Sequence, residues 1–159
     1  MSCWLFKSEP DIFSIDHLAA EPDQRCRWDG IRNYQARNFM RDDMQEGDGV
    51  LFYHSRCTPP GVVGVAKVVR TAYPDATAWD PKSDYYDPKS SPENPRWQMV
   101  DIQYVADLPT PMDLATIKAH DVLSEMLVAQ RGQRLSIQPV APEHWKLLLK
   151  LAGLPKLKL

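Results

Sequence analysis

The sequence predicts an α+β fold, in which a small, bent mixed β-sheet or open barrel of about five or six strands carries helices on its outside. Short apolar or alternating runs that are typical of strands are spread along the chain, with helical segments between them. Strands and helices do not alternate regularly, and no glycine-rich phosphate loop is present, which argues against a doubly wound sheet. With 159 residues, 43% of them hydrophobic, we expect one domain over residues 1–159.

The first third of the chain predicts one strand followed by two helices. Residues 3–6 (CWLF) form a short apolar run that is typical of a buried strand. Ser14 can cap a helix over residues 15–20, and the Glu-Pro-Asp sequence that follows ends it. Asn33 can cap a second helix that covers residues 34–44.

The middle of the chain predicts two buried strands and a long irregular segment. The strands are residues 50–53 (VLFY) and 62–69 (VVGVAKVV). Residues 70–96 contain prolines that interrupt regular structure, together with Tyr73, Trp79, Tyr85 and Tyr86. We expect so long and aromatic a segment to pack over another part of the domain or to carry function.

The last third predicts two more strands and a closing helix. Residues 97–105 (WQMVDIQYV) alternate as a half-buried strand does, and residues 111–120 indicate a short helix. Residues 123–128 fit either a helical or an extended piece. Residues 134–140 (RLSIQPV) are predicted to be the strand that closes the sheet, and residues 142–152 a helix that Gly153 and Pro155 end.

Composition narrows the classes of function. No apolar run approaches the roughly 18 residues of a membrane-spanning helix, and the apolar part of the N-terminus is too short for a signal peptide. Three cysteines without a CxxC pair favour reduced thiols, so we expect a cytoplasmic protein. The net charge is −2, so any binding of nucleic acid must depend on a local site rather than on a basic surface.

Metal and hydrolytic sites are not predicted. His54 and Cys57 form one half of a zinc-binding pattern, but no second half follows, so we expect no metal and no cofactor. Ser55 is adjacent to His54 and would point to the opposite face of a strand, and no G-x-S-x-G elbow exists. We therefore predict no catalytic residues.

The stretch WDGIRNYQARNFM, residues 28–40, is the best candidate for a binding site. Trp28 offers a flat face for stacking a base, and the Asn33 amide can both donate and accept at the edge of one. Arg32 and Arg37 can bind phosphate or stack. The alternative is that Trp28 is core, Asn33 only a helix cap and the arginines partners of nearby aspartates. Both interpretations stay open, and the first requires an indole ring that lies open at the rim of a concavity.

Several longer motifs point to a known family. The stretches CWLFKSEP, WDGIRNYQARNFM, LFYHS, GVVGVAKVV, AYPDATAWD, YYDP, RWQMVDIQYV and RLSIQPV, in this order, resemble the EVE domain family and run from Cys3 to Val140. The chain is similar to stand-alone bacterial members. The resemblance implies a PUA-like fold, a bent sheet or pseudo-barrel with flanking helices, related to the YTH domains that read N6-methyladenine in RNA through an aromatic cage.

The resemblance also implies a function. Members of the family are thought to bind a modified nucleobase, chiefly modified cytosine in DNA or a base in modified RNA, and in bacteria they occur beside restriction-type enzymes. By resemblance Trp28 would be a cage tryptophan and Asn33 the amide that reads the base edge. The other residues that the resemblance assigns to the site are Lys7, Ser8, Tyr53, His54, Ser55, Arg134, Ser136 and Gln138, with Trp79, Tyr85 or Tyr86 as a second aromatic wall. Arg32, from the stretch above, completes the predicted site.

Three hypotheses follow from the sequence. The first is a non-enzymatic reader of a modified base, with nucleic acid and restriction- or RNA-modification-type enzymes as partners and no membrane. The second is a small enzyme or enzyme subunit that acts on a modified nucleotide, with His54 as general acid or base. The third is a protein-interaction module that uses the aromatic segment of residues 73–97. The sequence does not fix the oligomeric state.

Overall fold

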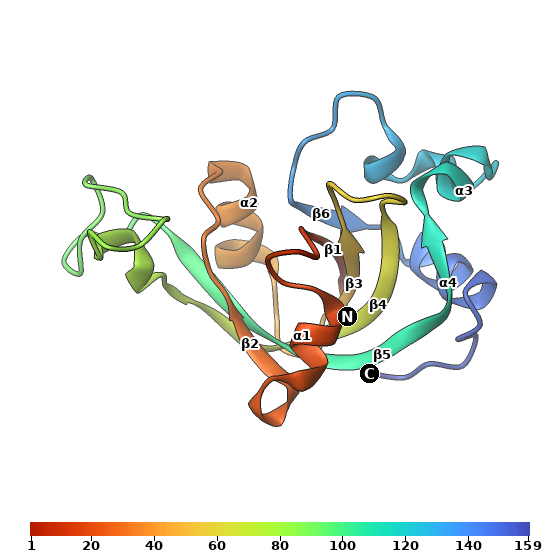
Figure 1. Ribbon diagram of the computed structural model, residues 1–159, viewed down its shortest axis with the longest axis horizontal. Coiled ribbons are helices and arrows are strands. Elements are labelled where there is room, and N and C mark those ends of the chain that lie inside the picture. Colours follow the sequence, from red (N-terminus) through yellow and green to blue (C-terminus); the bar gives the residue numbers. More distant parts are fainter.

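The structure, a computed structural model, describes residues 1–159 and is organised around one six-stranded mixed sheet (Figure 1). The strands are β1 (Cys3–Ser8), β2 (Arg25–Trp28), β3 (Gly49–His54), β4 (Gly61–Pro74), β5 (Gln98–Asp113) and β6 (Ile137–Val140). Their order in the sheet is β2-β5-β4-β3-β1-β6, and only the β1–β3 pair is parallel. The predicted α+β class with a mixed sheet is confirmed.

Helices cover both faces of this sheet. They are α1 (Ile15–Ala20), α2 (Tyr34–Asn38), α3 (Leu114–Ala119) and α4 (Pro142–Leu151). Shorter helical turns are η1 (Pro22–Gln24), η2 (Phe39–Asp43), η3 (Ala76–Trp79), η4 (Leu123–Glu125) and η5 (Leu127–Ala129). In Figure 1, α1 and α2 lie on one side of the sheet and α3 and α4 on the other. None of these helices has the length and apolar character that crossing a membrane requires.

Each face of the sheet has its own hydrophobic core, because neighbouring residues of a strand point to opposite faces. In β1, Leu5 packs into the core under α3 and α4, which also contains Trp145. The next residue, Phe6, packs into the core under α1 and α2, which also contains Leu18 and Met40. Both Leu5 and Phe6 are completely buried.

The sheet is strongly bent, and the bend brings its distant strands together. The pairing of β4 with β5 shifts register at four places, and such irregularities bend and twist strands. As a result Trp28, on the edge strand β2, lies 5.3 Å from Phe6 on β1 and 5.6 Å from Phe52 on β3, measured between ring centroids. The open side of this bend is where the candidate site lies.

The connection from β4 to β5, residues 75–97, forms an arm at the left of Figure 1. It is held to the loop after β2 by Asp75, a buried carboxylate whose Oδ2 accepts from the Gly30 N–H at 2.9 Å and lies 3.0 Å from an Arg32 guanidinium nitrogen. Burial would raise the pKa of Asp75, but hydrogen bonds from Thr77, Gly30 and Arg32 hold it below its usual value. The arm is therefore a packed part of the domain, as its aromatic content predicts.

Helix predictions near capping residues are accurate. Ser14 accepts from the His17 N–H at the start of α1, and the Asn33 side chain accepts from the Ala36 N–H at the start of α2. The second predicted helix continues past α2 as the π-helical turn η2. Residues 123–128, which the sequence left open, form the short turns η4 and η5.

Several elements differ from the prediction. The strands β4 and β5 continue to Pro74 and Asp113, past their predicted ends at residues 69 and 105. The strand β2 is not predicted at all, although RCRW alternates exposed arginines with inward side chains. The predicted helix over residues 111–120 begins only at Leu114, because residues up to Asp113 still pair with β4 and Asp113 caps the helix. The last strand begins at Ile137 rather than at residue 134.

Candidate binding pocket

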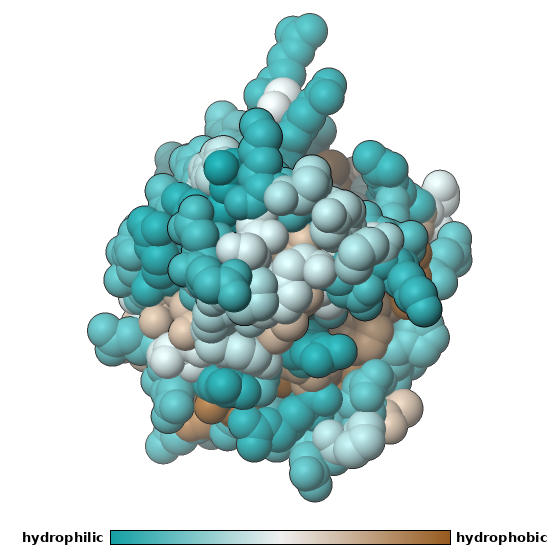
Figure 2. Space-filling view, turned by 90° about the vertical axis from the view of Figure 1, so that its left-hand side faces the viewer, coloured by the Kyte–Doolittle hydropathy of each residue, from teal (hydrophilic) through white to brown (hydrophobic).

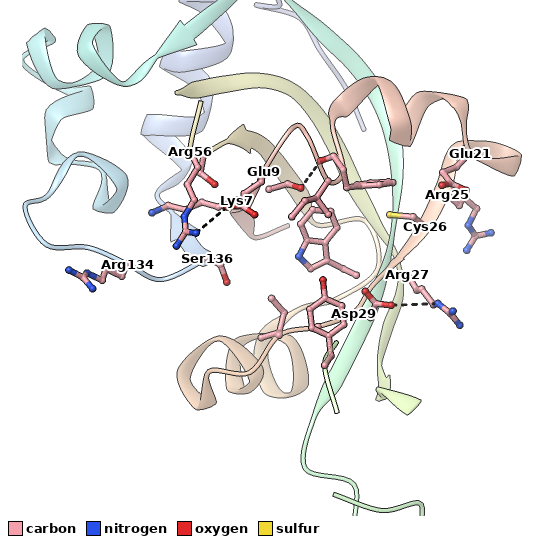
Figure 3. Close-up of a pocket in the computed structure, with 18 of the residues that line it drawn as sticks. Lys7, Glu9, Glu21, Arg25, Cys26, Arg27, Asp29, Arg56, Arg134 and Ser136 are labelled. Carbon is pink, nitrogen blue, oxygen red and sulfur yellow. Dashed lines mark hydrogen bonds and ion pairs between the residues drawn. The ribbon is translucent and has the colours of Figure 1, made fainter. Parts of the chain in front are cut away.

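A pocket of about 1150 Å³ opens where the bent sheet leaves β2 and β6 apart (Figure 3). Its lining comes from the end of β1 and the loop after it, the start of η1 and the whole of β2. The loop after β2, the residues that follow β3, the arm and the loop before β6 complete it. The twenty lining residues are Lys7, Ser8, Glu9, Ile12, Phe13, Glu21, Pro22, Arg25, Cys26, Arg27, Trp28, Asp29, Gly30, Ile31, Ser55, Arg56, Tyr85, Gln133, Arg134 and Ser136. This volume is large enough for a nucleotide.

Trp28 belongs both to the core and to the pocket wall. Its side chain is packed against Phe6, Phe52 and Phe13, and the residue is only 8% exposed. No protein group accepts a hydrogen bond from its Nε1–H, yet no fully buried side-chain nitrogen or oxygen in the structure lacks a partner. The N–H edge of the indole is therefore not fully buried, and Trp28 is one of the residues that line the pocket. The sequence predicted that the Trp28 ring would lie open at the rim of the pocket. In the structure the ring is buried, and only its N–H edge is free.

Aromatic and apolar groups surround this edge. Phe13 contacts Trp28 edge-on, with ring centroids 6.2 Å apart. The ring of Tyr85 lies directly over Gly30, where an added Cβ would stand 2.7 Å from the ring, so only glycine lets the arm approach this closely. Gly30 also has a φ of 81°, which disfavours other residues. Tyr85, 40% exposed, is thus the aromatic residue of the arm that reaches the pocket.

Charged side chains ring the pocket. Five are basic, namely Lys7, Arg25, Arg27, Arg56 and Arg134, and three are acidic, namely Glu9, Glu21 and Asp29. Lys7, Arg56 and Arg134 lie on one side in Figure 3, and Arg25 and Arg27 lie on the other. The pocket therefore has a local positive excess of two on a chain whose net charge is −2. Burial lowers the pKa of Lys7.

Two of the acidic residues are in ion pairs. Glu9 Oε1 lies 3.3 Å from a guanidinium nitrogen of Arg56. Asp29 Oδ2 lies 3.9 Å from Arg27 Nε, which is too long for a hydrogen bond. Burial, and then the charge of Asp75, raise the pKa of Asp29 above its usual value, and the charges of Arg27 and Arg32 only partly oppose this.

Seven of the residues predicted for the site line this pocket together: Lys7, Ser8, Trp28, Ser55, Tyr85, Arg134 and Ser136. The structure brings them from five separate parts of the chain. Ser8 donates its hydroxyl hydrogen bond to the carbonyl of Phe13, whereas the hydroxyls of Ser55 and Ser136 have no protein partner. The pocket thus offers free polar groups beside aromatic surface.

The other predicted site residues do not line the pocket. Asn33 and Arg32, which lie close to Trp28 in the chain, are held away from it by other hydrogen bonds. Asn33 is occupied as the cap of α2, with its Oδ1 3.0 Å from the Ala36 N–H. Arg32 is occupied by Asp75, Thr77 and the carbonyl of Tyr85. Both residues support the loop beside the pocket rather than face into it.

The remaining four lie elsewhere. Tyr53 and Gln138 point to the opposite face of the sheet, into or beside the core under α3 and α4. His54 Nε2 accepts from the Ile15 N–H at 3.1 Å, and burial lowers the His54 pKa. Trp79 lies in η3 of the arm and lines no pocket described above.

Sequence reasoning missed the β2 side of the pocket. Arg25, Cys26 and Arg27 line it because β2 is an edge strand, and the two-residue alternation of RCRW was the signal that could have identified them. The sequence suggests Asp29 only as a partner for arginine or, with His54 and Ser55, as part of a hydrolytic site that is not predicted, whereas the structure places it in the pocket lining. A second, shallower pocket of about 620 Å³ shares Lys7 and Gln133 with the first and contains Tyr53, Lys118 and Arg131.

Comparisons with known proteins agree over nearly the whole chain. A family model described as "EVE domain" matches residues 2–151. Thymocyte nuclear protein 1 of Gallus gallus is 44% identical over 165 residues, which cover 93% of this chain and 67% of that protein. A crystal structure from Pseudomonas syringae is 47% identical with a TM-score of 0.89, covering 94% of this chain and 99% of that one. The crystal structure of human THYN1 in complex with DNA containing 5-methylcytosine is 43% identical with a TM-score of 0.90, covering 96% and 98%.

Proposed function

The chain belongs to the EVE domain family, and from this membership we propose that it is a non-enzymatic module that binds nucleic acid carrying a modified base, with modified cytosine in DNA as the first candidate. The relative that was crystallised with DNA containing 5-methylcytosine supports the choice of ligand. The observation that carries the proposal in this chain is Trp28, a residue that is only 8% exposed, lines a pocket of nucleotide size and has an N–H without a protein partner.

A flipped base would fit this pocket in chemical terms. A base that leaves its stack loses a few kcal/mol, which aromatic contacts and hydrogen bonds inside a pocket can offset. Phe13 and Tyr85 supply aromatic surface, and Trp28 supplies the edge of its ring and a hydrogen-bond donor. A methyl group on the base would add about 0.8 kcal/mol if it is buried against this surface.

The charges around the pocket suit the phosphates on either side of such a base. Basic side chains stand on both sides of the opening, so the backbone of a strand can pass across while its base points inward (Figure 3). A few local cations, rather than an extended basic surface, are what a protein with net charge −2 can offer.

The two alternatives receive less support. An enzyme that uses His54 would need its imidazole in the pocket, but His54 does not line it and its Nε2 accepts a backbone hydrogen bond. A protein-binding module would need a continuous apolar face on the arm. Figure 2, which views that side of the molecule, shows a mainly hydrophilic surface with only small brown areas.

A binding panel with one conservative variant tests the proposal. Oligonucleotides that carry cytosine, 5-methylcytosine, 5-hydroxymethylcytosine, adenine or N6-methyladenine at one position are titrated against the protein and against Trp28→Phe. Phenylalanine keeps an aromatic ring in the core but removes the N–H. We expect the wild type to prefer a modified base by at least about threefold, and Trp28→Phe to weaken that binding by roughly 3–10-fold.

Trp79→Phe is the matched control, because it makes the same exchange in the arm and away from the pocket. It should leave the affinity unchanged. Equal affinity of the wild type for modified and unmodified oligonucleotides would contradict the proposal, and so would an equal loss in the two tryptophan variants.

A further inference from the structure

Of the three carboxylates that line the pocket, Asp29 is the one that directly follows Trp28 in the chain. Glu9 is paired with Arg56. Glu21 lies beside Arg25 at the far side of the pocket, beyond Cys26 (Figure 3). Asp29 lies between Arg27 and the interior of the pocket in the same view.

Asp29 is paired through one oxygen only. Its distant contact with Arg27 involves Oδ2, and no other residue donates a hydrogen bond to Oδ1. Because no fully buried side-chain oxygen in the structure lacks a partner, Oδ1 is accessible. The side chain is 31% exposed, and its raised pKa reflects a carboxylate that is poorly solvated and that a donor would stabilise.

Trp28 and Asp29 therefore present one free donor and one free acceptor at adjacent positions of the chain, in the same pocket. Cytosine presents the matching pair on its Watson–Crick edge, an amino group next to a ring nitrogen that accepts. Thymine presents the reverse, a carbonyl oxygen next to an N–H. Thymine and 5-methylcytosine carry the same methyl group and have nearly the same shape, so contacts with the methyl group cannot distinguish them.

We propose that Asp29 is the specificity-determining residue of the pocket, and that its free oxygen accepts a hydrogen bond from the exocyclic amino group of the bound base. The pocket then selects 5-methylcytosine over thymine, the base that deamination of 5-methylcytosine produces. This inference rests on the proposed function and adds the polar feature by which the base is read. A thymine in the same position would direct its carbonyl oxygen at a carboxylate, which is repulsive.

The test compares 5-methylcytosine with thymine in a duplex where neither base has a pairing partner, so that broken base pairs do not contribute to the difference in affinity. Each is placed at one position of an oligonucleotide duplex opposite an abasic site, and affinities are measured for the wild type, Asp29→Asn and Asp42→Asn. We expect the wild type to prefer 5-methylcytosine by about 10–100-fold. Asp29→Asn, whose amide can either donate or accept, should reduce that ratio to within about threefold of unity. Asp42→Asn, the same exchange at an exposed carboxylate outside the pocket, should keep it.

The outcomes separate this inference from the function on which it rests. If the wild type prefers 5-methylcytosine over cytosine but binds thymine equally well, or if Asp29→Asn keeps the ratio, the role of Asp29 is overturned while the proposed function stands. If no oligonucleotide with a modified base binds in preference to its unmodified counterpart, both are overturned. Thermal unfolding of each variant establishes that the comparison is made between folded proteins.

Discussion

At the scale of single residues, Trp28 carries two roles that the sequence presented as alternatives. The aromatic contacts of its ring place it in the core under α1 and α2, while its N–H edge faces the pocket. A residue with both roles cannot be tested by truncation, because loss of the ring alters the fold and the site together. This is why the exchange to phenylalanine, and not to alanine, separates binding from stability.

Trp28→Ala is therefore expected to act on stability first. Removal of a buried tryptophan from packed aromatic neighbours costs about 3–5 kcal/mol, a large part of the stability of a domain of this size. Chemical denaturation should show a midpoint far below that of the wild type, whereas Trp28→Phe should lie much closer to it. A Trp28→Ala protein of nearly wild-type stability would contradict the core assignment.

Asp29 leads to a prediction about pH. Because its pKa is raised in the folded protein, its ionised form is less favourable there than in the unfolded chain, so the charge lowers stability at neutral pH. Asp29→Asn should therefore unfold at a higher temperature than the wild type at pH 7. The advantage should shrink as the pH falls through the folded-state pKa and disappear below the unfolded value of about 3.9. If the difference in unfolding temperature between Asp29→Asn and the wild type stayed constant from pH 7 to pH 3, the raised pKa of Asp29 would not be its cause.

At the scale of elements, capping residues and apolar runs predict most of the helices and strands. The other elements depend on contacts between distant parts of the chain. Ser14 and Asn33 define helix starts through bonds within four residues, so the sequence alone predicts them. The β2 strand exists because it pairs with β5 more than seventy residues away, and the alternation of the four residues RCRW is its only local signal. The same limit applies to the site, since Tyr85 reaches the pocket only because the arm folds back over Gly30.

The link between the arm and the loop after β2 is testable through Arg32. Its guanidinium holds the buried Asp75 carboxylate and the Tyr85 carbonyl at once. Arg32→Ala leaves Asp75 without its ion-pair partner and should cost about 2–4 kcal/mol, somewhat below the range for fully buried pairs because Arg32 is partly exposed. It should also weaken oligonucleotide binding by displacing Tyr85.

Arg37→Ala is the matched control for that experiment. Arg37 lies over Tyr34 and donates a hydrogen bond to the Arg96 carbonyl at the end of the arm, but it does not contact Asp75 and does not line the pocket. Its loss should cost less stability than the loss of Arg32. Similar losses of stability in both variants would show that the Arg32–Asp75 pair is not what holds the arm in place.

At the scale of the whole molecule, the bend of the sheet makes the pocket. The strands β1 and β2 stand four positions apart in the sheet, yet Trp28 and Phe6 are in contact across the bend. The curvature depends on the register shifts between β4 and β5, which no local pattern in the sequence encodes. The identity of the strands was therefore largely predictable, but the position of the pocket and half of its lining were not.

The distribution of charge over the whole molecule sets the expected response to salt. Of the five basic residues around the pocket, Arg27 and Arg56 have acidic partners, which leaves Lys7, Arg25 and Arg134 for phosphates. Each phosphate neutralised on a single strand contributes about −0.7 to the slope of log K against log salt concentration, so the slope should be about −2. Affinities measured at several salt concentrations give this slope directly.

Arg134→Ala should make that slope shallower by about 0.7. Arg41→Ala should leave it unchanged, because Arg41 lies outside both pockets and is paired with the adjacent Asp42. A slope steeper than about −5, or an equal effect of the two variants, would mean that a diffuse charged surface holds the nucleic acid. A slope of about −2 that depends on Arg134 would instead place the strand across the opening of the pocket, where its base can enter.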